Sequence, residues 1–193
     1  MARSDNVYEL PKDLPEPQDD GACAHLFGMR LPSIQLPSTT GTRVDLSTLT
    51  GRTIVYCYPR TGRPDEEPLP GWDAIPGARG CTPQSCGFRD HYAELRQLGI
   101  NEVFGLSTQN TAYQREAAER LHLPFALLSD ETLALTRALE LPTFEIEGLT
   151  LIKRLTMLLS AGTIEHVFYP VFPPDANAPD VVHWVVERST VGR

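Results

Sequence analysis

The feature that most constrains how this chain folds is a strong helix start near residue 82. Thr82-Pro83 is typical of a helix N-terminus, because the Thr hydroxyl can cap free N–H groups and Pro has no N–H and a φ fixed near the helical value. Apolar residues then recur at helical spacing from Phe88 to Leu98, and Gly99 supplies a left-handed stop. We therefore expect a helix that begins near Pro83 with Thr82 as its N-cap.

Two cysteines, Cys81 and Cys86, stand five positions apart at the mouth of this helix. A thiol there faces unpaired backbone N–H groups and the positive end of the helix dipole, and both favour the nucleophilic thiolate. In an intact helix five residues correspond to about 140° of rotation and about 7.5 Å of rise. A disulfide needs Cα atoms within about 7 Å of each other and converging Cβ vectors. Cys81 is therefore the candidate nucleophile, and the two sulfurs could bond only if the first turn unwinds.

Other roles for the cysteines are weaker on the sequence. Cys23 and Cys57 are expected to be buried packing residues, because free cysteine is among the most buried residue types and Cys57 lies in the apolar run 53–58. Zinc bound by the two motif cysteines with His91 is an alternative. Structural zinc sites, however, use a tighter cysteine pair with a second matching pair, which this sequence lacks. We expect no metal and no other cofactor.

The chain has 193 residues and a formal net charge of −8. This length suits one good-sized core, and we expect an irregular N-terminal arm at 1–30, with Leu26, Phe27 and Met29 able to pack on a single domain at 31–193. The negative charge argues against nucleic-acid or anionic-membrane partners. Because no apolar run approaches 18 residues and the N-terminus has no apolar signal segment, a cytoplasmic protein with reduced thiols is expected.

Strand and helix patterns alternate along most of the chain. Segments 31–37 and 42–46 predict a β-hairpin, and the β-branched and aromatic run at 53–58 predicts a buried central strand. Further elements are expected in this order: strand 101–107, helix 111–121, strand 124–128, helix 131–139, a hairpin of 151–159 and 163–169, and helix 180–188. Such alternation around a reactive helix start predicts an α/β, thioredoxin-like fold with a central mixed sheet.

Residues 59–80 interrupt this alternation with five prolines and four glycines. Such a density excludes regular structure, and a loop of this length in a compact domain is usually functional or mobile. Because the loop ends beside Cys81, we expect it to shape the rim of the site, with a passive insertion as the alternative.

The run from Cys81 to Asp90, Cys-Thr-Pro-Gln-Ser-Cys-Gly-Phe-Arg-Asp, resembles the motif of the peroxiredoxin Q (bacterioferritin-comigratory) group. Segments 127–130 and 162–167 resemble later parts of that family in the correct order, and the similarity extends from about Leu31 to Arg188. The resemblance implies a thiol peroxidase that reduces hydrogen peroxide or organic hydroperoxides without a prosthetic group. It also implies thioredoxin or a similar dithiol protein as the reductant.

The resemblance implies a role for each matching residue. Cys81 matches the peroxidatic cysteine, whose thiolate attacks the peroxide and becomes a sulfenic acid, and Cys86 matches the resolving cysteine, which forms an intramolecular disulfide with it. Gln84 stands where the family has Glu or Gln. Arg154 matches an arginine that holds the thiolate and orients the peroxide, whereas without the motif it would be read as a surface cation. An intramolecular pair needs no second subunit, so we expect a monomer and leave a dimer open.

One position departs from the family pattern. The family carries Pro-x-x-x-Thr-x-x-Cys, whose Thr hydroxyl bonds the thiolate and the peroxide, but Ala78 stands three residues before Cys81. Thr61, on the far side of the insertion, is the first candidate for the missing hydroxyl, and Thr82 is the second. A protein disulfide oxidoreductase and a redox sensor, in which oxidation of Cys81 alters a partner-binding surface, remain alternative functions.

Overall fold

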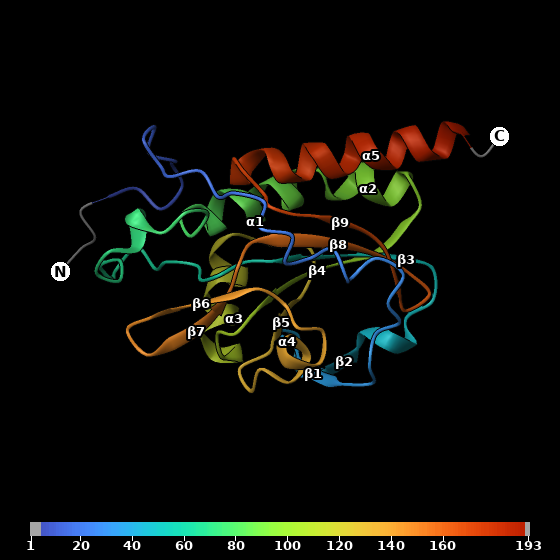
Figure 1. Cartoon of the computed structure of the whole chain (residues 1–193), viewed down its shortest axis with the longest axis horizontal. Coiled ribbons are helices and arrows are strands. Elements are labelled where there is room, and N and C mark those ends of the chain that lie inside the picture. Colours follow the sequence, from blue (N-terminus) through green and yellow to red (C-terminus); the bar gives the residue numbers. More distant parts are fainter. Residues whose placement is uncertain (1–4, 192–193) are drawn as a thin grey trace.

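The structure, a computed structural model, describes residues 5–191. Its centre is one five-stranded sheet formed by β3 (Arg52–Cys57), β4 (Ile100–Ser107), β5 (Leu127–Ser129), β8 (Leu155–Ser160) and β9 (Thr163–Phe168). The strands lie in the order β5-β4-β3-β8-β9 (Figure 1). The first three are parallel, whereas β8 is antiparallel to both β3 and β9. The predicted mixed sheet with β3 at its centre is therefore confirmed.

The alternation of side chains along β3 divides the core into two layers. Val55 and Cys57 enter one layer, Ile54 and Tyr56 enter the other, and all four are fully buried. The layer that contains Tyr56 is covered by α1 (Cys81–Asp90), α2 (Tyr92–Gln97), α3 (Thr111–Arg120) and α5 (Asn177–Val191). The opposite layer is covered by α4 (Ala134–Ala138) and by the hairpin of β1 (Gln35–Pro37) and β2 (Arg43–Asp45). Figure 1 shows α2 and α5 on one side of the sheet and β1, β2 and α4 on the other.

The helix that carries both motif cysteines begins earlier than predicted. α1 starts at Cys81, and its N-cap is Gly80 in a left-handed conformation with φ 101°, so the prediction that Thr82 is the N-cap was wrong. A Cβ on Gly80 would lie 2.7 Å from the side chains of both Leu10 and Pro174. The close approach of these two distant residues, together with the positive φ, explains why the chain enters the helix through glycine.

The predicted helix at 83–98 is divided in two. His91 leaves the helical conformation between α1 and α2, with φ −95° and ψ 3°, and its ring Nδ1 lies 2.9 Å from the carbonyl oxygen of Gly87. Gly99 has φ 88° and follows the end of α2, as predicted.

Two later elements are also shorter than predicted. The helix expected at 131–139 is reduced to α4, because Leu133 adopts φ 58° before it. The Asp130 carboxylate accepts from the N–H groups of Leu135 and Thr136, at 3.1 and 2.7 Å. The run expected as one strand at 151–159 is two strands, since β7 (Leu149–Ile152) pairs with an unpredicted strand, β6 (Thr143–Ile146), before β8 begins.

The N-terminal arm packs on the domain along much of its length. Cys23 and Leu26 are buried in the layer that contains Cys57, and Met29 packs against the same layer. Phe27 is 73% exposed, so the prediction that it packs on the domain was wrong. Within residues 5–191, none of the helices is long and apolar enough to cross a membrane.

Two glycines with nearly equal backbone angles allow a test of the sheet's packing. Gly162 joins β8 to β9 with φ 76°, and a Cβ there would lie 2.4 Å from the carbonyl oxygen of Ser47. Gly148 joins β6 to β7 with φ 74°, and nothing lies within 4 Å of its Cβ position.

We predict that Gly148→Ala lowers the free energy of unfolding by about 1 kcal/mol, from left-handed strain alone. Gly162→Ala should lower it by about 3 kcal/mol, because the Ser47 backbone must also move. Urea denaturation measures both values. Equal losses for the two variants would contradict the packing of Gly162 against Ser47.

Candidate active site

The site lies where β8 begins, beside the end of β3. Cys57, the last residue of β3, pairs with Leu155, the first residue of β8, so Arg154 stands just beyond this pairing. Side chains alternate along the strand, and Arg154 and Thr156 therefore point into the layer that contains α1. This alternation brings a side chain from position 154 to the N-terminus of a helix that begins at Cys81.

Arg154 is buried, with 3% of its surface exposed, and its guanidinium contacts the Cys81 sulfur. Nη2 donates to Cys81 Sγ at 3.2 Å and to the carbonyl oxygens of Ala78 and Arg79 at 3.1 Å each. Nε donates to the carbonyl oxygen of Gly77 at 3.3 Å. The reading of Arg154 as a surface cation is therefore excluded.

The charge of Arg154 is balanced by no carboxylate among residues 5–191, because none forms an ion pair with it. Burying a cation is costly unless an opposite charge or several hydrogen bonds compensate it. Its partners are carbonyl and amide oxygens and one sulfur, and the sulfur is the one of them that can become an anion. The guanidinium and the N-terminus of α1 thus both favour negative charge on Cys81.

Gln84 fixes the position of the guanidinium. The side chain is fully buried, its Oε1 accepts from Arg154 Nη1, and its Nε2 donates to Asn177 Oδ1 at 2.9 Å. The same Asn177 oxygen accepts from Thr156 Oγ1 at 2.7 Å. Asn177 and Thr156 were not predicted from the sequence, where the one available signal is that Thr156 lies on the same face of the strand as Arg154.

Ala78, which stands where the family motif has threonine in the sequence, presents its backbone carbonyl to the sulfur. Cys81 Sγ lies 3.6 Å from the carbonyl oxygen of Ala78, whose side chain is fully buried. Thr61 is also buried, but its hydroxyl and its N–H both donate to Gln109 Oε1, at 3.1 and 3.0 Å. The sulfur's hydrogen bonds within residues 5–191 are those with Ala78 and Arg154, so a role for Thr61 at the sulfur stays a prediction. Thr82 lines the cavity described next.

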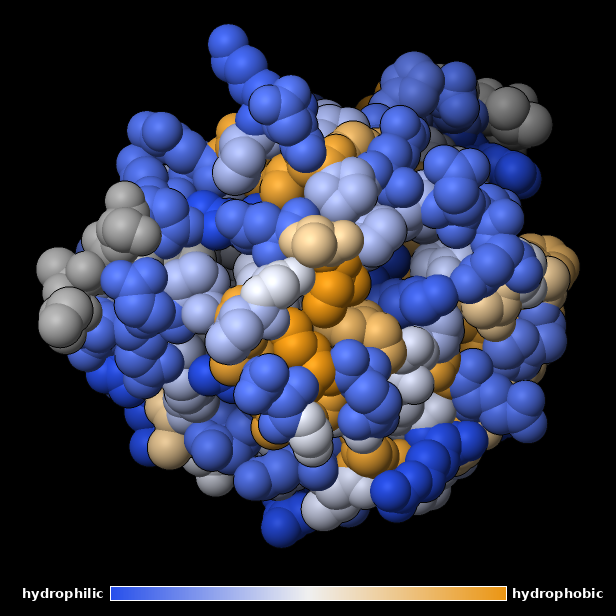
Figure 2. Space-filling view, turned by 60° about the vertical axis from the view of Figure 1, so that its left-hand side comes forward, coloured by the Kyte–Doolittle hydropathy of each residue, from blue (hydrophilic) through white to orange (hydrophobic). Residues whose placement is uncertain are grey.

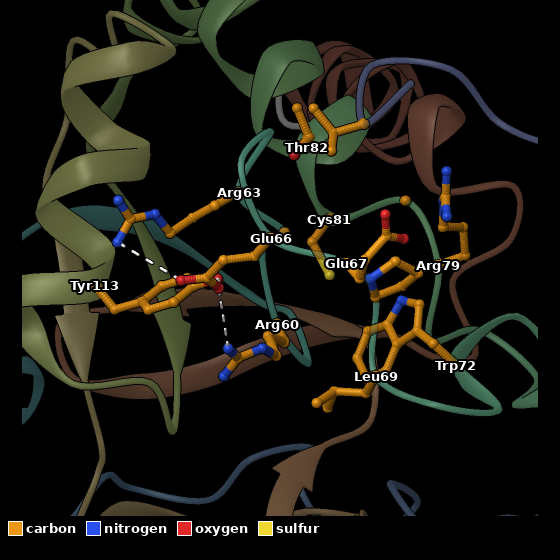
Figure 3. A pocket seen from close by; sticks show the side chains of 14 residues that line it. Arg60, Arg63, Glu66, Glu67, Leu69, Trp72, Arg79, Cys81, Thr82 and Tyr113 are labelled. Atoms are coloured by element: carbon orange, nitrogen blue, oxygen red, sulfur yellow. Dashed lines mark hydrogen bonds and ion pairs between the residues drawn. The ribbon is translucent and has the colours of Figure 1, made fainter. Parts of the chain in front are cut away.

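A cavity of about 290 Å³ opens at Cys81 and is walled mainly by the 59–80 loop. On one side the Arg60 guanidinium lies 4.6 Å from the ring centroid of Tyr113, whose hydroxyl donates to Glu66 at 2.9 Å. On the other side lie Leu69 and Trp72. Figure 3 shows the Cys81 sulfur between the two sides. The loop therefore forms the rim of the site and is not a passive insertion.

The N-terminal arm closes one edge of this cavity through Arg79. This arginine is 5% exposed and forms ion pairs with Asp5 of the arm and, at 3.2 Å, with Asp73 of the loop. Its Nη2 also donates to the carbonyl oxygen of Asn6 at 3.3 Å, and Val7 lines the cavity. The arm and the loop thus meet two residues before the candidate nucleophile.

Cys86 is half-buried in α1, five residues beyond Cys81, and both are free thiols in an intact helix. Burial raises the pKa of the Cys86 thiol, and the nearby Arg89 opposes that shift. The helix between the two cysteines is anchored to β3, because Tyr56 donates to Ser85 Oγ at 3.1 Å. Closing a disulfide would require the first turn of α1 to leave these contacts.

The other two cysteines lie in the layer on the far side of the sheet from Cys81. Burial raises the pKa of Cys23 to about 12 and holds the pKa of Cys57 far above its ordinary value. Both therefore fit the predicted role of inert packing residues. Within residues 5–191, no three His, Cys, Asp or Glu side chains gather into a group that could hold a metal ion.

The chain is similar in sequence to a known protein family and to two groups of relatives. The model of the Redoxin family matches residues 27–182. Peroxiredoxin Bcp of Escherichia coli (strain K12) is 32% identical over 163 residues, which cover 82% of this chain and 94% of that protein. The chloroplastic peroxiredoxin Q of Oryza sativa subsp. japonica is 33% identical over 152 residues, or 78% of this chain, and the matched part spans 62% of that protein's length.

A solved structure shows the same fold. Peroxidoxin BcpB from Mycobacterium tuberculosis superposes with a TM-score of 0.67 at 24% identity, over 83% of this chain and 96% of that chain. The predicted thioredoxin-like α/β fold is thereby confirmed.

The contrast between the four thiols can be tested by alkylation. With limiting iodoacetamide at pH 7, we predict that Cys81 reacts about tenfold or more faster than the other three, because its sulfur faces a cation and an open cavity. Mass spectrometry of digested protein gives the order of labelling, and labelling in urea provides the control in which all four react. Labelling of Cys86 at the rate of Cys81 would contradict the site described here.

Proposed function

Because the chain belongs to the Redoxin family, in its peroxiredoxin Q/Bcp group, we propose that it is a thiol peroxidase in which Cys81 reduces hydroperoxides. One observation carries the proposal. The buried Arg154 guanidinium donates to Cys81 Sγ at 3.2 Å, and no carboxylate in the described part of the chain pairs with it. A thiolate at Cys81 supplies the negative charge that compensates the buried guanidinium. A peroxide that binds the same guanidinium would be held beside the sulfur.

In the first step the Cys81 thiolate attacks the terminal oxygen of the hydroperoxide. An S–O bond forms, the O–O bond breaks, and the departing alkoxide or hydroxide takes a proton to leave as an alcohol or water. Arg154 donates to the oxygens as negative charge moves from sulfur to the leaving oxygen, which is the form of stabilisation that preorganised donors supply. The product on the protein is a Cys81 sulfenic acid.

In the second step Cys86 resolves this sulfenic acid. Its sulfur attacks the Cys81 sulfur, a disulfide forms, and hydroxide leaves with a proton as water. The attack requires the first turn of α1 to unwind, which breaks the hydrogen bonds Tyr56–Ser85 and Gln84–Asn177. A dithiol protein such as thioredoxin then reduces the disulfide and is itself oxidised.

The remaining predicted site residues act through these groups. Gln84 positions Arg154, since its Oε1 accepts from Nη1 and its amide is held by Asn177. Thr61 holds Gln109 and the start of the 59–80 loop. Thr82, which lines the cavity beside the sulfur, is the hydroxyl that an incoming peroxide would meet.

Serine variants of the two cysteines separate the steps. Cys81→Ser should abolish peroxide consumption, whereas Cys86→Ser should leave the first oxidation intact and trap a sulfenic acid. Stopped-flow peroxide oxidation measures the first step, and a dimedone adduct detected by mass spectrometry identifies the trapped acid. Cys23→Ser is the matched control and should behave like the wild type. Oxidation of Cys81 no faster than that of a free thiol would overturn the peroxidase proposal.

Arg154 and its neighbour Lys153 form a matched pair for testing the guanidinium. We predict that Arg154→Gln lowers the rate constant for Cys81 oxidation about 10²- to 10³-fold, the typical cost of removing one preorganised donor. Lys153→Gln removes an exposed cation that pairs with Asp20 and should change the rate less than about twofold. Stopped-flow oxidation of both variants by hydrogen peroxide measures the two rate constants. A similar decrease of the rate constant in both variants would contradict a local role for Arg154.

A further inference from the structure

The cavity at Cys81 is much larger than hydrogen peroxide requires. Its volume of about 290 Å³ is close to the lower end of the range of about 300–1,000 Å³ found for small-molecule sites. One water molecule takes up about 30 Å³ in the liquid, and hydrogen peroxide has only two heavy atoms. A substrate that fills the cavity must therefore carry a substituent of several carbon atoms beside its O–O group.

The wall opposite Arg60 and Tyr113 is apolar and firmly supported. Leu69 and Trp72 line it, and Trp72 is 7% exposed. Behind it the Trp72 ring lies 6.2 Å from that of Phe144, between centroids, and packs in one cluster with Ile146 and Leu151 of the β6–β7 hairpin. Figure 2 shows a band of hydrophobic residues among hydrophilic ones on this side of the molecule. Because the β6–β7 hairpin packs behind Trp72, the wall is a preformed surface against which an apolar group can bind.

The polar side of the cavity does not favour an anionic substrate. Arg60 and Arg63 lie 3.9 and 3.8 Å from the Glu66 carboxylate, and Arg63 also pairs with Asp65 at 3.2 Å, so two carboxylates already oppose the two guanidinium charges. The exposed carboxylate of Glu67 also lines the cavity and adds negative charge near Cys81 (Figure 3). A carboxylate on the substrate would meet this charge, whereas a neutral substituent would not.

We propose that Leu69 and Trp72 are specificity-determining residues that select neutral hydroperoxides with a bulky apolar substituent, of the aryl-alkyl class. The inference rests on the proposed function. The terminal oxygen of the substrate meets the Cys81 sulfur beside the Arg154 guanidinium, and its apolar group lies against Leu69 and Trp72. The sulfur takes the terminal oxygen, the O–O bond breaks, and the bulky alkoxide leaves as the corresponding alcohol after taking up a proton.

The experiment compares rate constants for Cys81 oxidation by three probes: hydrogen peroxide, cumene hydroperoxide, and cumene hydroperoxide with a para-carboxylate. The wild type should react fastest with the neutral aromatic probe. Trp72→Ala should lower the rate with cumene hydroperoxide about tenfold, as expected for loss of part of an apolar pocket, and change the rate with hydrogen peroxide less than twofold. Ile75→Ala is the matched control, because Ile75 belongs to the same apolar cluster without lining the cavity.

Three results would overturn the inference: equal losses with both neutral probes in Trp72→Ala, a loss of selectivity in Ile75→Ala as large as in Trp72→Ala, or a wild type that prefers the carboxylated probe. If Trp72→Ala does not fold, Leu69→Asp at the half-buried Leu69 replaces it and should show the same selective loss. Failure of the proposed function looks different, because Cys81 of the wild type would then react with none of the three probes faster than a free thiol does.

Discussion

The Arg154 guanidinium lies buried against the Cys81 sulfur, and every other part of the site bears on this contact. Backbone carbonyl oxygens from 77–79 and the Gln84 amide satisfy its N–H groups without neutralising it. Desolvation of a cation is thereby offset by hydrogen bonds, while its charge remains available to the sulfur. The start of α1, the start of β8 and residues 77–79 at the end of the 59–80 loop must therefore all meet at one point.

The proposed chemistry places opposite demands on α1. Cys81 can feel the guanidinium and the helix N-terminus only while the first turn is folded, yet a bond to Cys86 needs that turn to open. Besides the Arg154 guanidinium, the contacts that hold the turn are neutral hydrogen bonds and side-chain packing, such as Tyr56–Ser85 and the close approach of Leu10 and Pro174 to Gly80. A net contribution of about 1 kcal/mol for each such hydrogen bond suits a turn that is ordered in the reduced state and can still be released.

The 59–80 loop changes the site in two ways at once. It brings the carbonyl oxygen of Ala78, three residues before Cys81, to face the sulfur, and it adds a wall that contains Trp72. The β6–β7 hairpin supports this wall from behind, and Arg79 joins the loop to the N-terminal arm. Loop, hairpin and arm are far apart in the sequence, but together they turn an exposed helix start into a cavity.

The sequence by itself predicted most of the strand and helix order and a helix start at the two cysteines, and it distinguished the two cysteines by their positions, because periodicity, turn residues and spacing are local properties of the chain. It also indicated Arg154 and Gln84, but only through their resemblance to a family motif. The tertiary structure alone decided that Arg154 is buried, that Gln84 is held by Asn177, 93 residues away, that Thr61 bonds to Gln109, and that the N-cap of helix α1 is Gly80 rather than Thr82. Each of these depends on contacts between distant segments, and local propensity carries no information about which distant side chain will arrive.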